Sequence, residues 1–263
     1  HFEIRNVLQT LGEFGPMLAH LQKAEALARS LADDRKLGWV SAYLTDYFRL
    51  TGDQDRAIEA GERGRRIAES LQDFPLQVAT NTWLGQALYG RGEYRRAATL
   101  FTRKVESLVG TRLTERFGAP QPRSVHSRTC LVWCLTELGE FREAARRGEE
   151  ALQIAQPLEH PQSLTTACAG VGYLYLRQGQ VAKAIALLER GLEATRAGNI
   201  PLWFPRVAST LGLAYARAGR TREGLALLED AVDQGLAMKM MGAHSLLLVS
   251  LGEGYLLSGR VED

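Results

Sequence analysis

Three residues that can bind metal ions lie at regular spacing in one short stretch of the sequence. His126, Cys130 and Cys134 are separated by four residues each, which would place them on one face of a helix. Across those eight residues a helix rises about 12 Å, whereas a zinc ion holds its ligands within about 2.3 Å. Only two of the three could share one ion, with Cys168 as an outside candidate. Because buried structural cysteines are common, we expect neither a metal site nor a cofactor.

The residues that could carry out catalysis are scattered. His20, His160 and His244 lie far apart in the chain, and the sequence has no Gly-x-Ser-x-Gly or His-Glu-x-x-His motif. It also has no Gly-Lys pair, so it contains no phosphate-binding P-loop. Many carboxylates stand beside arginines, as in "RRGEEAL", which is typical of solvated ion pairs on helices. Since nothing supplies a nucleophile, a base and an orienting group together, the chain is predicted not to be an enzyme.

The overall composition narrows the partners that the chain could have. Its 263 residues include 32 Lys and Arg against 30 Asp and Glu, a net charge of +2 that gives no case for binding nucleic acid. No run of 18 apolar residues is present, so we expect no membrane span. Three cysteines without a framework of spacings favour a reducing compartment, and we expect a cytoplasmic protein. The sequence begins without Met or a signal peptide, so we expect a fragment of a longer, multidomain protein.

A repeat organises residues 1–263 into what we predict is a single array. Seven glycines mark the repeat: Gly12, Gly52, Gly92, Gly139, Gly179, Gly219 and Gly259. Their spacing is 40 residues, except for 47 between Gly92 and Gly139. An aromatic residue or leucine stands four residues before the last six glycines, and small residues recur five and twelve residues after most of them. These are helical spacings, so each repeat is predicted to be two antiparallel helices joined at a left-handed glycine.

The predicted fold class is therefore all-α, an α-solenoid of stacked helical hairpins with about thirteen helices. Seven of the eight prolines fall between one hairpin and the next, and Pro16 falls in the first turn of a helix. The seven extra residues of the long interval lie in residues 110–128, which we expect to form a structured excursion or a mobile loop.

The repeats resemble tetratricopeptide (TPR) repeats. The stretches "GVGYLYLRQGQVAKAIALLERGLEAT" and "TLGLAYARAGRTREGLALLEDAVDQG" follow that family's order of aromatic, Leu-Gly, Tyr, Gly and Ala positions. The period of 40 is longer than the family's usual 34 residues. Three other stretches, "LGWVSAYLTDYFRLTGD", "NIPLWFPRVASTLGLAYARAGR" and "LLLVSLGEGYLLSGR", resemble the C-terminal TPR region of bacterial adenylate/guanylate cyclase–ATPase signalling proteins. That resemblance implies a parent protein with a cyclase or ATPase domain, which this chain lacks.

The TPR resemblance also implies which residues line the concave groove. They stand thirteen, ten, six, three and two residues before each repeat glycine, and we expect the following to bind a ligand: Trp39, Arg49, Tyr89, His126, Trp133, Tyr173, Arg177, Arg206 and Arg217. Asp46, Gln86, Glu137 and Glu253 occupy the same positions. Aromatic and arginine side chains dominate binding hot spots. Equally, the aromatic residues could pack between repeats and the arginines could form a solvated face.

We interpret the chain as a protein–protein interaction and regulatory module that binds a peptide or partner domain in this groove. Arg177, Arg206 and Arg217 would favour an acidic ligand, since guanidinium groups suit carboxylates. An alternative is the small-molecule-sensing effector domain of an ATPase-type regulator, in which Trp39, Trp133 and Tyr173 would stack on a sugar ring. A third alternative is self-association, for which we expect the uncapped C-terminal end to be responsible.

Overall fold

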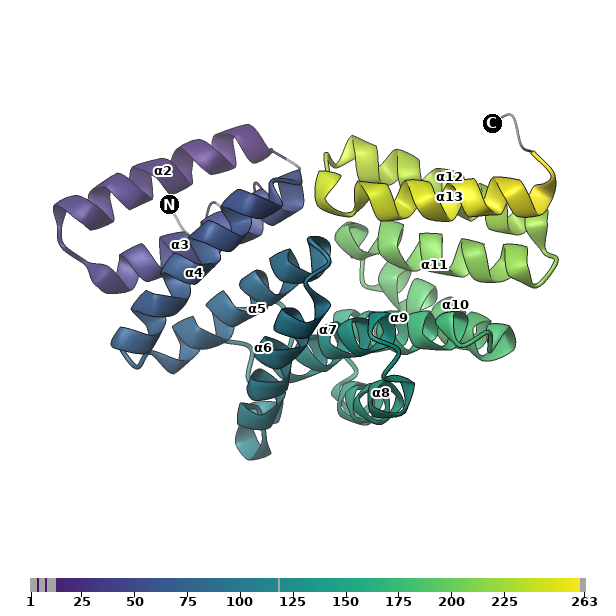
Figure 1. Cartoon of the computed structure of the whole chain (residues 1–263), viewed down its shortest axis with the longest axis horizontal. Helices are drawn as coiled ribbons and strands as arrows, with labels where there is room; N and C mark the ends of the chain where they lie inside the picture. The colour runs from purple at the N-terminus through teal and green to yellow at the C-terminus, as the bar shows by residue number, and fades with distance from the viewer. Residues whose placement is uncertain (1–3, 5–7, 9–12, 118, 261–263) are drawn as a thin grey trace. The chain divides into compact units, whose positions relative to one another are not determined.

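The computed structural model of the chain describes Ile4, Leu8, residues 13–117 and residues 119–260. Within these residues it contains twelve α-helices and four short 3-10 helices, and every regular element is helical. The predicted all-α fold of about thirteen helices is confirmed (Figure 1). Gly12 and most of the first predicted helix lie outside the described residues. The chain divides into two compact units, which are described separately below.

Unit 1 comprises residues 1–104 and 238–242. Its helices are α2 (Phe14–Ser30), α3 (Asp34–Thr51), α4 (Gln54–Ser70), α5 (Phe74–Gly90) and the greater part of α6 (Tyr94–Ser107). Helix α3 packs against both its hairpin partner α4 and the next first helix, α5. This double contact, in which each first helix touches its own second helix and the following first helix, is how a helical solenoid buries its core.

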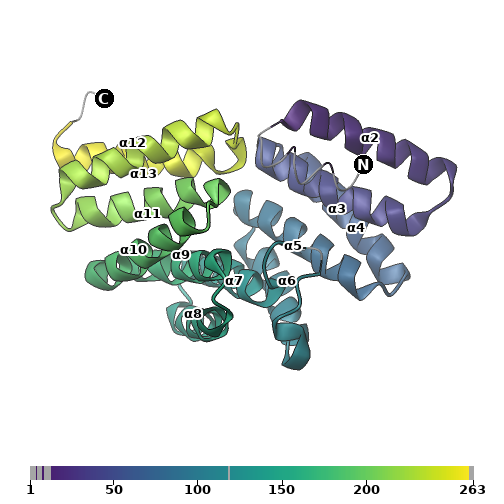
Figure 2. The same ribbon diagram turned by 180° about the vertical axis from the view of Figure 1, so that it is seen from behind.

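Unit 2 comprises residues 105–237 and 243–263. Its helices are α7 (Arg123–Glu137), α8 (Phe141–Ala155), α9 (Pro161–Arg177), α10 (Val181–Ala197), α11 (Phe204–Arg217), α12 (Thr221–Ala237) and α13 (His244–Ser258). The 3-10 helices Gly110–Leu113, Gln156–Leu158 and Pro201–Trp203 lie in its connections, and a fourth, Met241–Ala243, precedes α13. The first helices α7, α9, α11 and α13 pack side by side in that order (Figure 2).

The turn inside each hairpin has the conformation that its glycine predicts. Gly52, Gly92, Gly139, Gly179, Gly219 and Gly259 all have left-handed backbones, with φ between 74° and 92°. After Gly139, for example, the Glu140 N–H donates to the Leu135 carbonyl at 2.8 Å, which closes the end of α7. A residue with a Cβ is disfavoured in this conformation, so glycine recurs at each of these turns.

The turns between hairpins are also left-handed but use no glycine at that position. Five of these positions recur with positive φ between 46° and 54°: Ala32, Gln72, Glu159, Asn199 and Lys239. Within each unit they follow the same 40-residue period, as Gln72 lies 40 residues after Ala32 and Asn199 lies 40 after Glu159. The repeat therefore fixes the backbone at two turns, of which only one has a distinctive residue.

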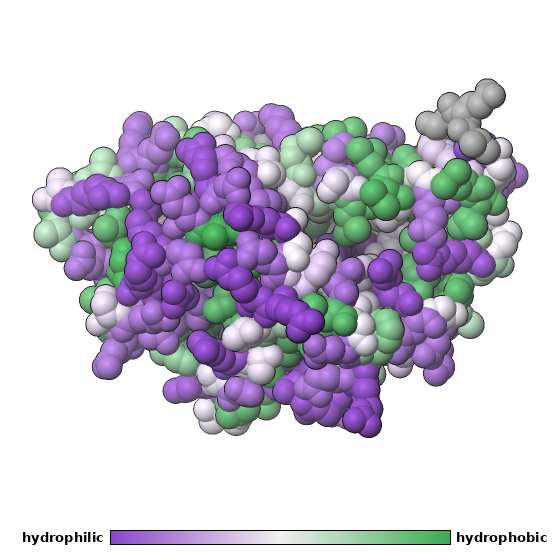
Figure 3. All heavy atoms as spheres, viewed as in Figure 1, coloured by the Kyte–Doolittle hydropathy of each residue, from purple (hydrophilic) through white to green (hydrophobic). Residues whose placement is uncertain are grey.

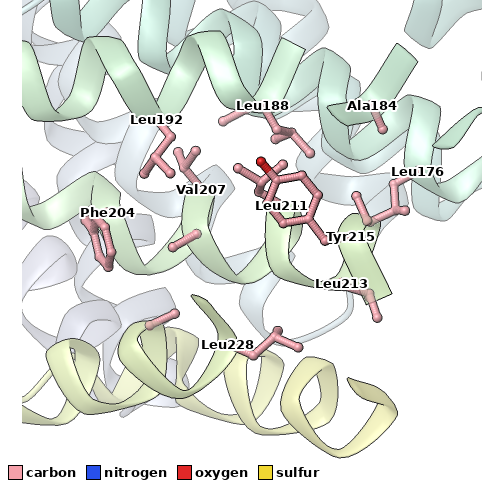
Figure 4. Packing of buried hydrophobic residues seen from close by; sticks show 14 of the residues in the cluster. Leu176, Ala184, Leu188, Leu192, Phe204, Val207, Leu211, Leu213, Tyr215 and Leu228 are labelled. Atoms are coloured by element: carbon pink, nitrogen blue, oxygen red, sulfur yellow. The ribbon is translucent and has the colours of Figure 1, made fainter. Parts of the chain in front are cut away.

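The core of unit 2 is formed where α10, α11 and α12 pack together around Leu188, Leu211 and Leu228, which are at most 1% exposed (Figure 4). The small residues predicted by the repeat make this packing close. A Cβ placed on Gly212 of α11 would lie 2.7 Å from the Gly224 carbonyl oxygen of α12, and one on Gly224 would lie 2.5 Å from the Gly212 oxygen. The two backbones are therefore in direct contact.

The long interval between repeats forms a structured connection ahead of α7. The Arg123 N–H donates to the Glu115 carbonyl at 3.2 Å, and the Thr166 hydroxyl of α9 donates to Gln121 at 3.1 Å. Gln121 is only 3% exposed. Of the two predicted possibilities for residues 110–128, the structured excursion is the one observed, and its last part, from Arg123, belongs to α7.

Candidate functional site

A small hollow opens among the first helices α9, α11 and α13 of unit 2, and we call it the arginine hollow. Its volume is about 80 Å³. The polar residues that line it include Tyr173, Arg177, Arg206, Arg217 and Glu253. Four of these five were predicted as binding residues, and they come together because the repeat places them on the same face of consecutive first helices.

Positive charge predominates in the lining of the arginine hollow. Its lining contains three arginines and one carboxylate, that of Glu253. Arg217 pairs with Glu253, since its guanidinium nitrogen lies 2.5 Å from the Glu253 carboxylate. Arg177 is more open, because its side chain is 49% exposed and its guanidinium lies 3.8 Å from Glu137. An anion entering the hollow would therefore find arginine charge in excess of carboxylate charge.

An aromatic cluster continues the arginine hollow. The Arg206 guanidinium lies 4.0 Å from the centre of the Trp133 ring, a cation–π contact. Trp203 joins this cluster, with its ring centre 6.2 Å from that of Trp133 and 6.3 Å from that of His126. Trp133 and His126 are each only 6% exposed, so they support Arg206 and Trp203 from behind more than they present a surface of their own.

The residues on the remaining walls explain how the hollow is held open. The Tyr173 hydroxyl donates to the Glu137 carboxylate, which also faces Arg177. Leu213 of α11 and Leu246 and Val249 of α13 add an apolar wall. Val249 is 68% exposed. The hollow thus combines a cationic side with an apolar side, and could hold a group that is charged at one end and aliphatic at the other.

The structure places the other three predicted residues in unit 1. Trp39 lies against Tyr43, with 5.7 Å between ring centres, and Tyr89 lies against Tyr94 at 5.3 Å. Arg49 lies 5.6 Å from the Trp83 ring, so unit 1 has an arginine–tryptophan contact of its own. These residues do not line the arginine hollow.

The cysteine stripe forms no metal site within the described residues. Cys130 lies 3.8 Å from His126 Nδ1, while Cys134 points into the core of unit 2. Burial raises the pKa of the Cys134 thiol, and it raises the pKa of Cys168 to about 11. Both thiols therefore stay protonated at neutral pH, when they are weak ligands and weak nucleophiles.

Trp203 is a site residue that the sequence reasoning missed. It lies at the end of the 3-10 helix Pro201–Trp203, just before α11. The repeat offsets select positions within first helices, so a residue in the connection lay outside the rule. The signal that could have identified it is its place in "NIPLWFPR", three residues before Arg206.

No family model matches the chain. It is 24% identical over 157 residues to a mitochondrial tetratricopeptide repeat protein 19 homolog of Drosophila melanogaster, a match covering 57% of this chain and 41% of that protein. None of the helices in the described parts of the chain is long and apolar enough to cross a membrane.

Solved structures with the same fold are TPR and Rap proteins. A Rap protein complexed with Competence and Sporulation Factor gives a TM-score of 0.67 at 16% identity, covering 93% of this chain and 70% of that one. BtubC from P. vanneervenii gives 0.61 at 21% identity, covering 86% and 92%. A thermophilic TPR protein from Thermus thermophilus gives 0.53 at 20% identity, covering 80% and 99%. The chain therefore has a TPR-like solenoid fold.

Proposed function

We propose that the chain is a protein–protein interaction module that binds a peptide or a segment of a partner protein at the arginine hollow. The observation that carries this proposal is the convergence of Arg177, Arg206 and Arg217 with Tyr173 and an apolar wall in one hollow. Arginine and aromatic side chains on rigid helices are suited to anchoring a partner's side chains. No nucleophile–base pair is found in the lining, which agrees with a binding role.

The size of the hollow favours a peptide side chain over a free small molecule. Pockets for small molecules usually enclose about 300–1,000 Å³, whereas the arginine hollow holds about 80 Å³. That volume suits one side chain of a longer ligand whose remainder lies along the helices. The alternative of a small-molecule-sensing effector domain is therefore less well supported at this site. A Rap protein with the same fold is complexed with Competence and Sporulation Factor, which supports ligand binding on such a scaffold.

We further propose that the chain acts in the cytoplasm as the regulatory part of a bacterial signalling protein. The support is its resemblance to the TPR regions of cyclase–ATPase proteins, together with three free, buried cysteines. Trp39, Arg49 and Tyr89 would then contribute a second contact surface, in unit 1.

Self-association through α13 is a separate proposal. Leu248, Val249, Leu256 and Leu257 of this helix are between 46% and 68% exposed, and apolar surface is visible over α13 in Figure 3. Exposed apolar patches favour association, so a second copy is expected to bind there. Sedimentation at increasing concentration measures this, and a constant monomer mass would contradict it.

A matched pair of substitutions tests the peptide site without assuming the ligand's chemistry. Thr210 lines the arginine hollow on α11, and Thr99 lies exposed on α6; each hydroxyl donates to the carbonyl four residues earlier. Thr210→Trp would fill the hollow, while Thr99→Trp adds the same bulk elsewhere. A random dodecapeptide library displayed on phage would be selected against the wild type and both variants, with circular dichroism as the check of folding.

The expected result is that the wild type and Thr99→Trp enrich a common set of peptides and that Thr210→Trp does not bind them. If the wild type enriches no peptide, or Thr210→Trp binds the same set equally well, the proposed peptide site is wrong.

A further inference from the structure

We infer that the arginine hollow selects acidic peptide segments, and specifically a carboxylate side chain followed closely by an aliphatic residue. This inference rests on the proposed function, since it names the chemistry of the peptide that the hollow would bind. It is carried by the distribution of charge among three arginines, by the stacking of Arg206 and by the apolar wall from α13.

The three arginines of the hollow differ in how much of their charge is already balanced. Arg217 has Glu253 at 2.8 Å from its Nε and at 2.5 Å from a terminal nitrogen, so its charge is largely balanced. It is also 3.5 Å from the Leu176 carbonyl, which ties it to α9. Arg217 therefore holds α9, α11 and α13 together and is a positioning residue. The excess positive charge comes from Arg177 and Arg206.

Arg177 and Arg206 are placed to bind one carboxylate from two sides. Arg177 lies at the C-terminal end of α9 with half of its side chain in solvent, and its distance to Glu137, 3.8 Å, is longer than a hydrogen bond. Arg206 stacks on Trp133 through the face of its guanidinium, at 4.0 Å. The N–H groups of a guanidinium lie in its plane, so stacking on the face is compatible with bidentate contact between the edge and a carboxylate.

The apolar wall determines what accompanies the carboxylate. Leu213, Leu246 and Val249 line the side of the hollow formed by α11 and α13, and Val249 is 68% exposed. A ligand with only acidic residues would leave this wall in water. A segment in which Asp or Glu is followed within one or two residues by Leu, Ile or Val would use both sides, because burial of apolar surface adds to the ionic contact.

The test measures charge preference directly with peptides from the selection described above. The most enriched sequence would be synthesised with a fluorescein label and a C-terminal amide, so that its carboxylates belong to side chains only. A second peptide would have Gln and Asn in place of Glu and Asp. Anisotropy titrations would compare the wild type, Arg177→Glu and the control Arg142→Glu, which reverses an exposed charge on the second helix α8.

The expected result is an excess of Asp and Glu beside aliphatic residues among the selected peptides. Arg177→Glu should weaken the acidic peptide about tenfold or more, the amide peptide should bind the wild type about tenfold more weakly, and Arg142→Glu should bind like the wild type. Enrichment without acidic residues, or equal affinity of both peptides, would overturn this inference. Loss of binding in Thr210→Trp would still stand in that case, so failure here is separable from failure of the proposed peptide site.

Discussion

The two compact units each stack one arginine against a tryptophan, but they balance its charge differently. In unit 1, Arg49 lies 5.6 Å from Trp83 and donates to Asp46 at 2.6 Å. Asp46 is only 1% exposed, so that ion pair is part of the packed interior. In unit 2, Arg206 stacks on Trp133 at 4.0 Å and lines a hollow with more arginines than carboxylates.

This difference shows that residue type and repeat position do not decide the role of an arginine on the first-helix face. A cation whose counter-ion is buried beside it mainly stabilises the fold, because its charge and donors are already used. A cation that shares a solvent-open hollow with other cations is available to a ligand. We therefore expect substitutions in unit 1 to change stability and substitutions in unit 2 to change binding.

The largest expected effect is the loss of stability on removing Asp46. Asp46→Ala would leave Arg49, whose side chain is 22% exposed, beside Trp83 without its carboxylate. We expect the free energy of unfolding of unit 1 to fall by about 2 kcal/mol, since breaking a largely buried pair leaves a poorly solvated charge. Urea unfolding, with hydrogen exchange of α3 and α5 to assign the loss to unit 1, measures this.

The matched control in unit 2 is Glu253→Ala, which removes the partner of Arg217. Both members of that pair are at least 30% exposed, so its loss should cost less than about 1 kcal/mol. Equal destabilisation by Asp46→Ala and Glu253→Ala would contradict the distinction drawn between the units.

The next effect in size concerns binding and compares the two stacked arginines directly. Arg206→Gln keeps a polar side chain in the arginine hollow but removes its charge, and it should weaken an acidic peptide about tenfold, because a charged hydrogen bond contributes about 1.5–3 kcal/mol. Arg49→Gln should change the same affinity less than about twofold, since Arg49 pairs with Asp46. Anisotropy titrations measure both. If Arg49→Gln weakened binding as much as Arg206→Gln did, the assignment of the peptide site to unit 2 would fail.

The sequence predicted the hairpins because their turn demands a particular residue. At Gly139 and its equivalents the left-handed backbone selects glycine, so the 40-residue period could be read directly. The turns between hairpins have a similar backbone at Gln72 and Glu159, but the residue type varies there. These turns tolerate different side chains at some conformational cost, and no single residue type marked them in the sequence.

The candidate site was predicted only in part, because the repeat gives positions and not neighbours. It identified Tyr173, Arg177, Arg206 and Arg217, which the structure gathers in one hollow. It could not show that Glu253 pairs with Arg217, since that contact depends on side-chain conformations across two helices.

The smallest expected effect concerns the first residues of two first helices. In unit 1 the Asp73 carboxylate caps α5 by accepting from the Leu76 N–H at 3.1 Å. Burial raises the pKa of Asp73, but hydrogen bonds from Arg35 and the Leu76 N–H lower it by more, so Asp73 stays ionised near neutral pH. In unit 2 the equivalent cap of α9 is His160, whose Nδ1 accepts from the Ser163 N–H at 3.3 Å. Only the second of these caps can titrate between pH 5 and 7.

Burial and the charge of Arg116 lower the pKa of His160 below its ordinary value of 6.5, against a hydrogen bond to the Pro120 carbonyl. The unfolded chain therefore binds more protons than the folded one below pH 6.5, and unit 2 should lose stability as the pH falls from 7 to 5.5. His160→Asn keeps a capping acceptor that does not titrate, and it should flatten this dependence by less than about 1 kcal/mol. Hydrogen exchange at the start of α9, corrected for intrinsic rates, measures this, with Asp73→Asn as the control that should leave the pH dependence of α9 unchanged. An identical pH dependence in the wild type and His160→Asn would show that the cap of α9 does not respond to pH, and that the two units begin their first helices in the same way.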